Sequence, residues 1–168
     1  GDVYKRQGHT RYATTGSDGV SDLQPMVTGF PFGIGMAHNG NLVNYHELRE
    51  MLVENHHLQL LTNNDLEVIM HIWCLEIQKN RMSDQQSQKI SFDDIAQAAR
   101  GVVEKVEGGF AVVGMMGNVG LFAFRDPNGI RPLVMGKKMG KDGIARYCFV
   151  SESLALNFLG FDFVRDVK

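Results

Sequence analysis

A short turn in the second half of the chain constrains the fold more than any other feature. Gly117-Asn118 separates two strand-like apolar runs, residues 110–116 and 119–124. A glycine turn between two such runs is typical of a β-hairpin. Further strands are predicted over residues 131–135 and 145–151, joined by a basic, glycine-rich loop at 136–143. This half of the chain is therefore predicted to form antiparallel sheet.

Three segments before this turn show the apolar spacing of helices. The first covers residues 45–55, the second begins at a cap formed by Asn63 or Asn64, and the third covers residues 91–106. Residues 78–89 are polar and are predicted to form a surface connection. Strands, three helices and then antiparallel strands predict a layered α+β domain and argue against a doubly wound sheet.

Charge and hydropathy exclude several classes of function. The 168 residues include 17 basic and 19 acidic side chains, giving a net charge of −2 without a basic stripe, so we expect no nucleic-acid partner. No apolar run approaches the roughly 20 residues of a membrane span, so we expect a soluble protein with no membrane partner. Cys74 and Cys148 stand alone, which favours a reducing, cytoplasmic setting and gives no metal signature.

The run at residues 37–42, Ala-His-Asn-Gly-Asn-Leu, carries the first chemical signal. An apolar strand over residues 33–37 is expected to stop there. The side-chain amide of Asn39 and the backbone N–H of Gly40 are two donors of the kind that stabilise an oxyanion during acyl transfer. Gly40 also lacks Cβ, which lets a reacting carbonyl approach the main chain. The alternative is an ordinary hairpin turn, which the pair favours when taken by itself, because Asn-Gly at the end of an apolar run usually closes a hairpin.

Two charged residues could recognise an amino acid. Arg11 lies in a glycine-bounded segment rich in hydroxyls, and its guanidinium can hold an α-carboxylate through two parallel hydrogen bonds. Asp65 begins the second predicted helix, where it could bind an α-ammonium group. The structural alternatives are a surface ion pair for Arg11 and a helix cap for Asp65. Cys74, on the same helix as Asp65, is interpreted as a buried core thiol.

Five segments occur in one order: GHTRYATTG (8–16), AHNGNL (37–42), NNDLE (63–67), FRDPNGIRPL (124–133) and SESLAL (151–156). Together they resemble the glutaminase domain of the amidophosphoribosyltransferases, over about residues 8–168. The first two segments are shared by N-terminal-nucleophile amidotransferases in general, and the last two are more specific to the amidophosphoribosyltransferases. The resemblance implies a four-layer αββα sandwich of the N-terminal-nucleophile hydrolase type, incomplete at its N-terminus.

The resemblance also implies a role for single residues. The residues that would contact glutamine are Arg11 at the α-carboxylate, Asp65 at the α-ammonium group, Asn39 and Gly40 in the oxyanion hole, and Thr14 as a weaker contact. Thr14 would belong to a loop over residues 11–22 that covers the substrate. The implied reaction is hydrolysis of glutamine to glutamate and ammonia, with the ammonia passed to phosphoribosyl pyrophosphate to give 5-phosphoribosylamine in purine synthesis.

The nucleophile of that family is an N-terminal cysteine, whereas residue 1 here is Gly1. We interpret residues 1–7 as a non-family segment joined to a partial type 2 glutamine amidotransferase domain, residues 8–168. We therefore expect the fragment to be inactive. No cofactor is expected in this chain: two cysteines cannot complete the four-cysteine iron–sulfur cluster of some relatives, and Mg²⁺ is expected only with the missing phosphoribosyltransferase domain.

Two other functions stay open on the sequence. One is the glutaminase domain of glucosamine-phosphate synthase, which shares the GHTR and HNG elements, although DPNGIRPL argues against it. The other is a non-catalytic fragment that binds glutamine. The expected partners are glutamine, the missing phosphoribosyltransferase domain and, in a full-length enzyme, further copies in a homo-oligomer.

Overall fold

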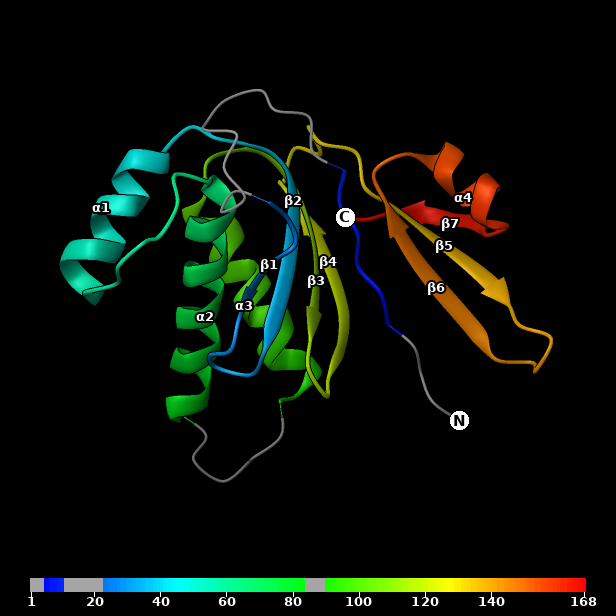
Figure 1. Cartoon of the computed structure of the whole chain (residues 1–168), viewed down its shortest axis with the longest axis horizontal. Coiled ribbons are helices and arrows are strands. Elements are labelled where there is room, and N and C mark those ends of the chain that lie inside the picture. Colours follow the sequence, from blue (N-terminus) through cyan, green and yellow to red (C-terminus); the bar gives the residue numbers. More distant parts are fainter. Residues whose placement is uncertain (1–4, 11–22, 84–89) are drawn as a thin grey trace.

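The computed structural model describes residues 5–10, 23–83 and 90–168, with the backbone alone for residues 80–83. Arg11, Thr14 and the predicted substrate loop at 11–22 lie outside the described residues. The elements in chain order (Figure 1) are β1 (Met26–Thr28), β2 (Ile34–Leu42), α1 (Tyr45–His56), α2 (Asp65–Ser83), α3 (Phe92–Lys105), β3 (Gly108–Met116), β4 (Gly120–Arg125), β5 (Val134–Met139), β6 (Ala145–Val150), α4 (Ser153–Leu159) and β7 (Asp162–Asp166).

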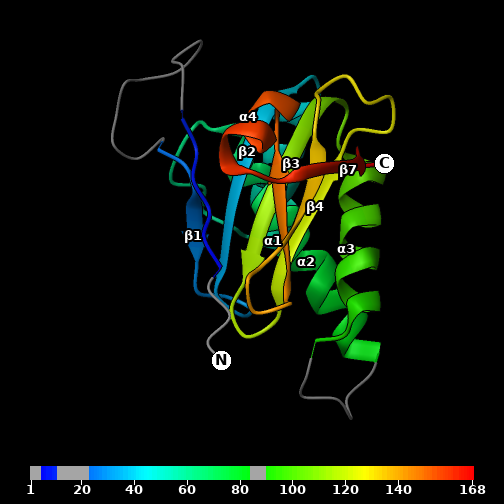
Figure 2. The same cartoon turned by 90° about the vertical axis from the view of Figure 1, so that its right-hand side faces the viewer.

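Two antiparallel sheets lie between layers of helix. Sheet A has the strand order β1-β2-β3-β4, and sheet B has the order β6-β5-β7. Helices α1, α2 and α3 lie on the outer side of sheet A, and α4 lies on the outer side of sheet B (Figure 1). Figure 2, viewed from the side of α4, places sheet B in front of sheet A. This arrangement confirms the predicted α+β class and the αββα order of layers.

The main hydrophobic core fills the space between sheet A and its helices. Trp73 on α2 is fully buried, and its ring stacks on Phe122 of β4 with the centroids 4.3 Å apart. Side chains alternate between the two faces of a strand, so Phe122 faces the helices while its neighbour Ala123 faces sheet B. A second, smaller cluster between the sheets contains Ala111, Leu133 and Val167.

Three local predictions are confirmed. The Asn64 side chain caps α2, because its Oδ1 accepts a hydrogen bond from the Leu66 N–H at 3.0 Å. Ser91 and Asp94 form a capping box at the start of α3, with each side chain accepting from the other's backbone N–H. The β3–β4 hairpin turns over residues 117–119, where Asn118 has a φ of 61°.

The predicted end of the first strand is wrong. β2 continues to Leu42, because β3 pairs with it along its whole length, from Ile34 opposite Met116 to Leu42 opposite Gly108. The Asn39-Gly40 pair therefore lies inside a strand, and the hairpin-turn alternative is wrong as well. The residue types Asn and Gly by themselves favour a turn, but the antiparallel pairing of β2 with β3 decides the backbone conformation here.

Three further boundaries differ from prediction. Helix α2 extends to Ser83 and takes up the first part of the predicted surface connection. Strand β5 covers 134–139 instead of 131–135, because its pairing with β6 continues to Met139 opposite Ala145. Neither β1 nor α4 was predicted; both are short, and a segment of three to seven residues carries little periodic signal.

Candidate functional site

A cleft of about 1260 Å³ opens beside the end of β2, between residues of sheet A and residues that belong to or border sheet B. Asn39, Gly40 and Asp65 all line it, so the fold brings these three predicted site residues together. Arg11 and Thr14 lie outside the described residues, although residues 8–10, which immediately precede Arg11, also line the cleft. The side facing β2 is formed by Arg131, Leu133 and residues 149–152.

The backbone of β2 presents the Gly40 N–H to the open edge of the strand. Phe110, which faces Gly40 on β3, uses its own N–H and C=O on Asp126 instead. In an antiparallel ladder, facing residues exchange both hydrogen bonds or neither, so Gly40 directs its N–H away from β3. His38 lies two residues before Gly40, so its N–H points to the same side of the strand. There it donates to Oε1 of Gln24 at 2.7 Å.

Asn39 supplies the second predicted donor. Its side chain is exposed at the cleft and forms no hydrogen bond with any described residue. The amide is therefore free to donate to a ligand. Asn39 and the Gly40 N–H form the pair of adjacent donors that an oxyanion hole needs, and their catalytic role stays a prediction.

The absence of a side chain at Gly40 has a structural cause that sequence reasoning missed. The residue has a φ of +147°, and a Cβ there would overlap the carbonyl oxygen of Gly109 and lie 2.7 Å from Cα of Phe110. Both obstacles are backbone atoms of β3, which cannot move without disturbing the sheet. Gly40 is therefore required by the close approach of two strands, whether or not a substrate also approaches it.

Asp65 is the first residue of α2, and it is not the helix cap, since Asn64 caps α2. Its Oδ1 lies 3.4 Å from Nδ1 of His38, and its side chain is 21% exposed. The carboxylate is therefore accessible from the cleft while one edge rests against a buried imidazole. This geometry suits the recognition of an ammonium group.

A buried carboxylate fixes the turn that carries Asp65. Glu67, only 5% exposed, accepts hydrogen bonds from the N–H groups of Leu61 and Thr62 and from the Thr62 hydroxyl, each at 2.7 Å. Oγ1 of Thr62 in turn accepts the N–H of Asn64 at 3.1 Å. The turn before α2 is thereby held in one conformation, which fixes the position of Asp65 at the cleft.

His38 is a buried functional candidate that sequence reasoning missed. Burial lowers the pKa of its imidazole below the ordinary value; the carboxylate of Asp65 acts in the opposite direction, and the charges of His9 and Arg131 add to the lowering. Its Nε2 is buried without a hydrogen-bond partner in the part of the chain that the structure describes. Its only sequence signal is its place directly before Asn39.

The turn at residues 126–129, Asp-Pro-Asn-Gly (the DPNG turn), places Arg131 at the cleft. The buried carboxylate of Asp126 accepts hydrogen bonds from the N–H groups of Phe110, Ile130 and Arg131, at 3.2, 2.9 and 3.2 Å. Burial alone would raise the pKa of Asp126, but these backbone donors outweigh it and lower the pKa below its ordinary value. In the segment at 124–133, Asp126 therefore has a structural role: it fixes the backbone of the turn. This turn brings Arg131 to the cleft.

Comparison with known proteins identifies the family. Residues 9–157 match the model of the glutamine amidotransferase domain. The chain belongs to this family. It is 42% identical to the amidophosphoribosyltransferase of Escherichia coli K12 and 38% identical to that of Saccharomyces cerevisiae, and each match covers 95% of this chain but only 31% and 30% of the relative. The chain thus spans about a third of the length of these relatives.

Solved structures agree with this assignment. One is a structure of the allosteric regulatory enzyme of purine biosynthesis, with a TM-score of 0.71, 31% identity, and coverage of 95% of this chain and 30% of that chain. Another is the glutamine phosphoribosylpyrophosphate amidotransferase of Bacillus subtilis complexed with ADP and GMP, with a TM-score of 0.70, 30% identity and the same coverage. The N-terminal-nucleophile hydrolase fold expected for this amidotransferase domain is thereby confirmed.

Neither cysteine of this amidotransferase domain lines the cleft. Cys74 on α2 is buried, its Sγ donates to the Phe30 carbonyl at 3.4 Å, and burial raises its pKa to about 12. Cys148 on β6 is half-buried, and burial raises its pKa too. Both thiols are therefore protonated near neutral pH and are poor nucleophiles. The interpretation of Cys74 as a core thiol is confirmed.

Across residues 5–10, 23–83 and 90–168, no three His, Cys, Asp or Glu side chains are grouped so that they could hold a metal ion. In those same ranges, no helix combines the length and apolar character needed to cross a membrane.

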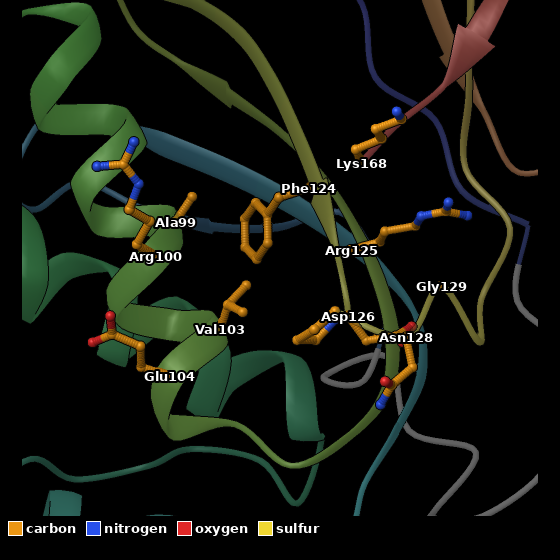
Figure 3. A pocket seen from close by; sticks show the side chains of 11 residues that line it. Ala99, Arg100, Val103, Glu104, Phe124, Arg125, Asp126, Asn128, Gly129 and Lys168 are labelled. Carbon is orange, nitrogen blue, oxygen red and sulfur yellow. The ribbon is translucent and has the colours of Figure 1, made fainter.

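A second cavity, of about 560 Å³, lies between α3 and the DPNG turn (Figure 3). Ala99, Val103 and Phe124 line its apolar part, and its charged residues include Arg100 and Lys168. It contains none of the predicted site residues that the structure describes, and of its three basic residues Arg100 and Lys168 are exposed to solvent while Arg125 is half-buried. The larger cleft beside β2 is therefore the candidate site of the amidotransferase domain.

Proposed function

We propose that this chain is the glutamine-binding part of an amidophosphoribosyltransferase. In the longer protein it would hydrolyse glutamine and supply ammonia for the formation of 5-phosphoribosylamine from phosphoribosyl pyrophosphate. The observation that carries this proposal is the cleft itself: the accessible carboxylate of Asp65 and the uncommitted donors of Asn39 and Gly40 open into one space. The similarity to amidophosphoribosyltransferases over 95% of the chain supports the choice of enzyme.

Different residues recognise the two ends of glutamine, the α-carbon with its charged groups and the carboxamide. Asp65 receives the α-ammonium group, and Arg11, whose placement is not described, receives the α-carboxylate. The carboxamide then lies at the end of β2, where the amide of Asn39 and the N–H of Gly40 donate to its oxygen. As a nucleophile adds to the carboxamide carbon, negative charge grows on that oxygen, and two fixed donors stabilise the transition state more than the ground state.

The chain by itself is proposed to bind glutamine without turning it over. Attack on the carboxamide requires a thiolate beside the oxyanion hole, and the two cysteines of this sequence lie elsewhere with raised pKa values. Loss of a covalent nucleophile costs several powers of ten in rate, whereas binding groups keep their function. Glutamine affinity and glutamine turnover are therefore separable in this chain.

Isothermal titration calorimetry with L-glutamine tests the proposal. The wild-type chain should bind glutamine, and Arg11→Ala and Asp65→Ala should each weaken the affinity by at least about tenfold, the loss expected for a charge-assisted contact. Arg146→Ala is the matched control, because Arg146 pairs with Asp142 on the surface and does not line the cleft. Its affinity should equal that of the wild type.

A glutamate-release assay completes the test. We expect no release above background from the wild-type chain under conditions in which calorimetry shows glutamine bound. An absence of glutamine binding would contradict the proposed function. Robust release would contradict the proposal that this chain lacks a working nucleophile.

The expected partners and compartment are part of the same proposal. The phosphoribosyltransferase domain of the longer protein is the proposed acceptor of ammonia and the place where Mg²⁺ would act, and full-length copies would form a homo-oligomer. Two free cysteines fit a cytoplasmic protein. Glucosamine-phosphate synthase is not favoured as the parent enzyme, since the Escherichia coli and Saccharomyces cerevisiae relatives at 42% and 38% identity are amidophosphoribosyltransferases.

A further inference from the structure

The imidazole of His38 is enclosed by groups that constrain its protonation. The side chain is 2% exposed, with Asp65 at its Nδ1, and the charges of His9 and Arg131 act on it as well. No hydrogen-bond partner among the described residues meets its Nε2. Burial, with the charges of His9 and Arg131, outweighs the opposite effect of Asp65 and lowers the pKa of the imidazole, which favours the neutral ring with one proton.

The position of that proton follows from the two possible tautomers. With the proton on Nε2, a buried N–H would have no acceptor among the described residues, and the lone pair of Nδ1 would face the Asp65 carboxylate at 3.4 Å. With the proton on Nδ1, the N–H belongs to the ring atom nearest the carboxylate, 3.4 Å from its Oδ1, and only an acceptor lone pair on Nε2 stays unpaired. The Nδ1–H tautomer therefore has the lower energy, because it replaces a repulsion with a charge-assisted attraction.

Asp65 depends on this contact for its orientation. Among the described residues, His38 is the one polar side chain that contacts the Asp65 carboxylate, and no backbone N–H of those residues donates to it. His38 is itself held by β2 and by the Gln24 side chain, which accepts its backbone N–H. The paired strand β2 thus supports, through His38, the carboxylate of Asp65. Asp65 is the first residue of α2 and lies 27 positions later in the chain.

We propose that His38 is a positioning residue for substrate recognition: as a neutral Nδ1–H donor it orients the Asp65 carboxylate toward the α-ammonium group of the ligand. The proposal rests on the proposed function for the identity of the ligand, but not for the contact between His38 and Asp65. One donor on β2 would then couple the oxyanion-hole strand to the ammonium site, because His38 directly precedes Asn39.

The tautomer is measured first, without any ligand. The full chain is labelled with ¹⁵N in the imidazole rings, and the signals of His38, one of six histidines, are assigned by their loss in His38→Asn. At pH 7 we expect a neutral ring protonated on Nδ1, and we expect Asp65→Ala to remove that preference. An imidazolium, an Nε2–H tautomer, or a ring unaffected by Asp65→Ala would each overturn the proposal.

Ligand binding then separates positioning from a general structural effect. L-Glutamine is compared with glutaramate, the same molecule with hydrogen in place of the α-ammonium group. His38→Leu should weaken glutamine binding by about tenfold, the value of one charge-assisted hydrogen bond, and should change glutaramate binding by less than about twofold. His38→Asn, whose amide can donate from a similar position, should retain glutamine affinity within about threefold of the wild type.

The outcomes distinguish this inference from the proposed function. Equal weakening of both ligands by His38→Leu, or no weakening of glutamine, would overturn the positioning role. If the wild-type chain binds no glutamine at all, the proposed function fails, and the ¹⁵N measurement still decides whether His38 donates to Asp65. Circular dichroism and the thermal midpoint of each variant identify those that fail to fold.

Discussion

Gly40→Ala tests how closely β2 and β3 approach at the candidate site. The structure predicts two separate costs for the added methyl group. The backbone has a φ of +147°, which L side chains resist, and the new Cβ would overlap the Gly109 carbonyl oxygen and lie 2.7 Å from Cα of Phe110. Backbone strain costs about 1–3 kcal/mol, and overpacking against atoms that cannot rotate away costs about 1–3 kcal/mol more.

Two other glycines separate these costs. Gly33 has a φ of +65° with no atom within 4 Å of an added Cβ, so Gly33→Ala carries the conformational cost alone, about 1–2 kcal/mol. Gly120 has neither a positive φ nor a near neighbour, so Gly120→Ala should leave the free energy of unfolding nearly unchanged. The expected order of stability is therefore Gly120→Ala, then Gly33→Ala, then Gly40→Ala.

Thermal unfolding followed by tryptophan fluorescence measures the series, because Trp73 is the single tryptophan and is fully buried. For a chain of this size, about 4 kcal/mol corresponds to a fall of roughly 10 °C in Tm. If Gly40→Ala unfolds within about 2 °C of Gly33→Ala, the two strands do not approach as described. The requirement for glycine would then have to come from the ligand alone.

Three further predictions follow from single contacts. Asp126→Asn should lower the free energy of unfolding by about 2 kcal/mol at pH 7, because it weakens the hydrogen bonds from Phe110, Ile130 and Arg131. Because the folded-state pKa of Asp126 is lowered, its contribution to the free energy of unfolding is present above the ordinary pKa of 3.8 and is lost as the pH falls through the folded-state pKa. Denaturant titrations in acid should therefore show the stabilities of the wild type and Asp126→Asn converging. Ser91→Ala should cost about 1 kcal/mol through loss of the α3 capping box, with unchanged glutamine affinity by calorimetry, and a loss of affinity would contradict its purely structural role. Iodoacetamide at pH 8 should alkylate Cys74 only on unfolding, since its thiol is buried with a pKa of about 12, and mass spectrometry of the native protein would refute this by finding Cys74 modified as fast as Cys148.

Features that depend on a few neighbouring residues could be predicted from the sequence. The Asn64 cap, the Ser91–Asp94 capping box and the β3–β4 hairpin each involve groups within about four residues of one another, so local chemistry decides them. The order of the predicted elements also led to the α+β class, and the resemblance to the glutaminase domain of the amidophosphoribosyltransferases implied the αββα order of layers. Asn39, Gly40 and Asp65 could be selected because their residue types suit one reaction.

The environment of those site residues was decided by tertiary structure alone. β2 continues through Asn39-Gly40 because a strand some 70 residues later pairs with it, and the same strand explains why position 40 must be glycine. His38 contacts Asp65 only because β2 and the start of α2 meet at one cleft. The amino-acid sequence by itself thus determined which chemical groups are present and where helices and turns begin. The folded chain decided which groups are paired, buried or free, because backbone pairing and burial depend on atoms that are distant in sequence.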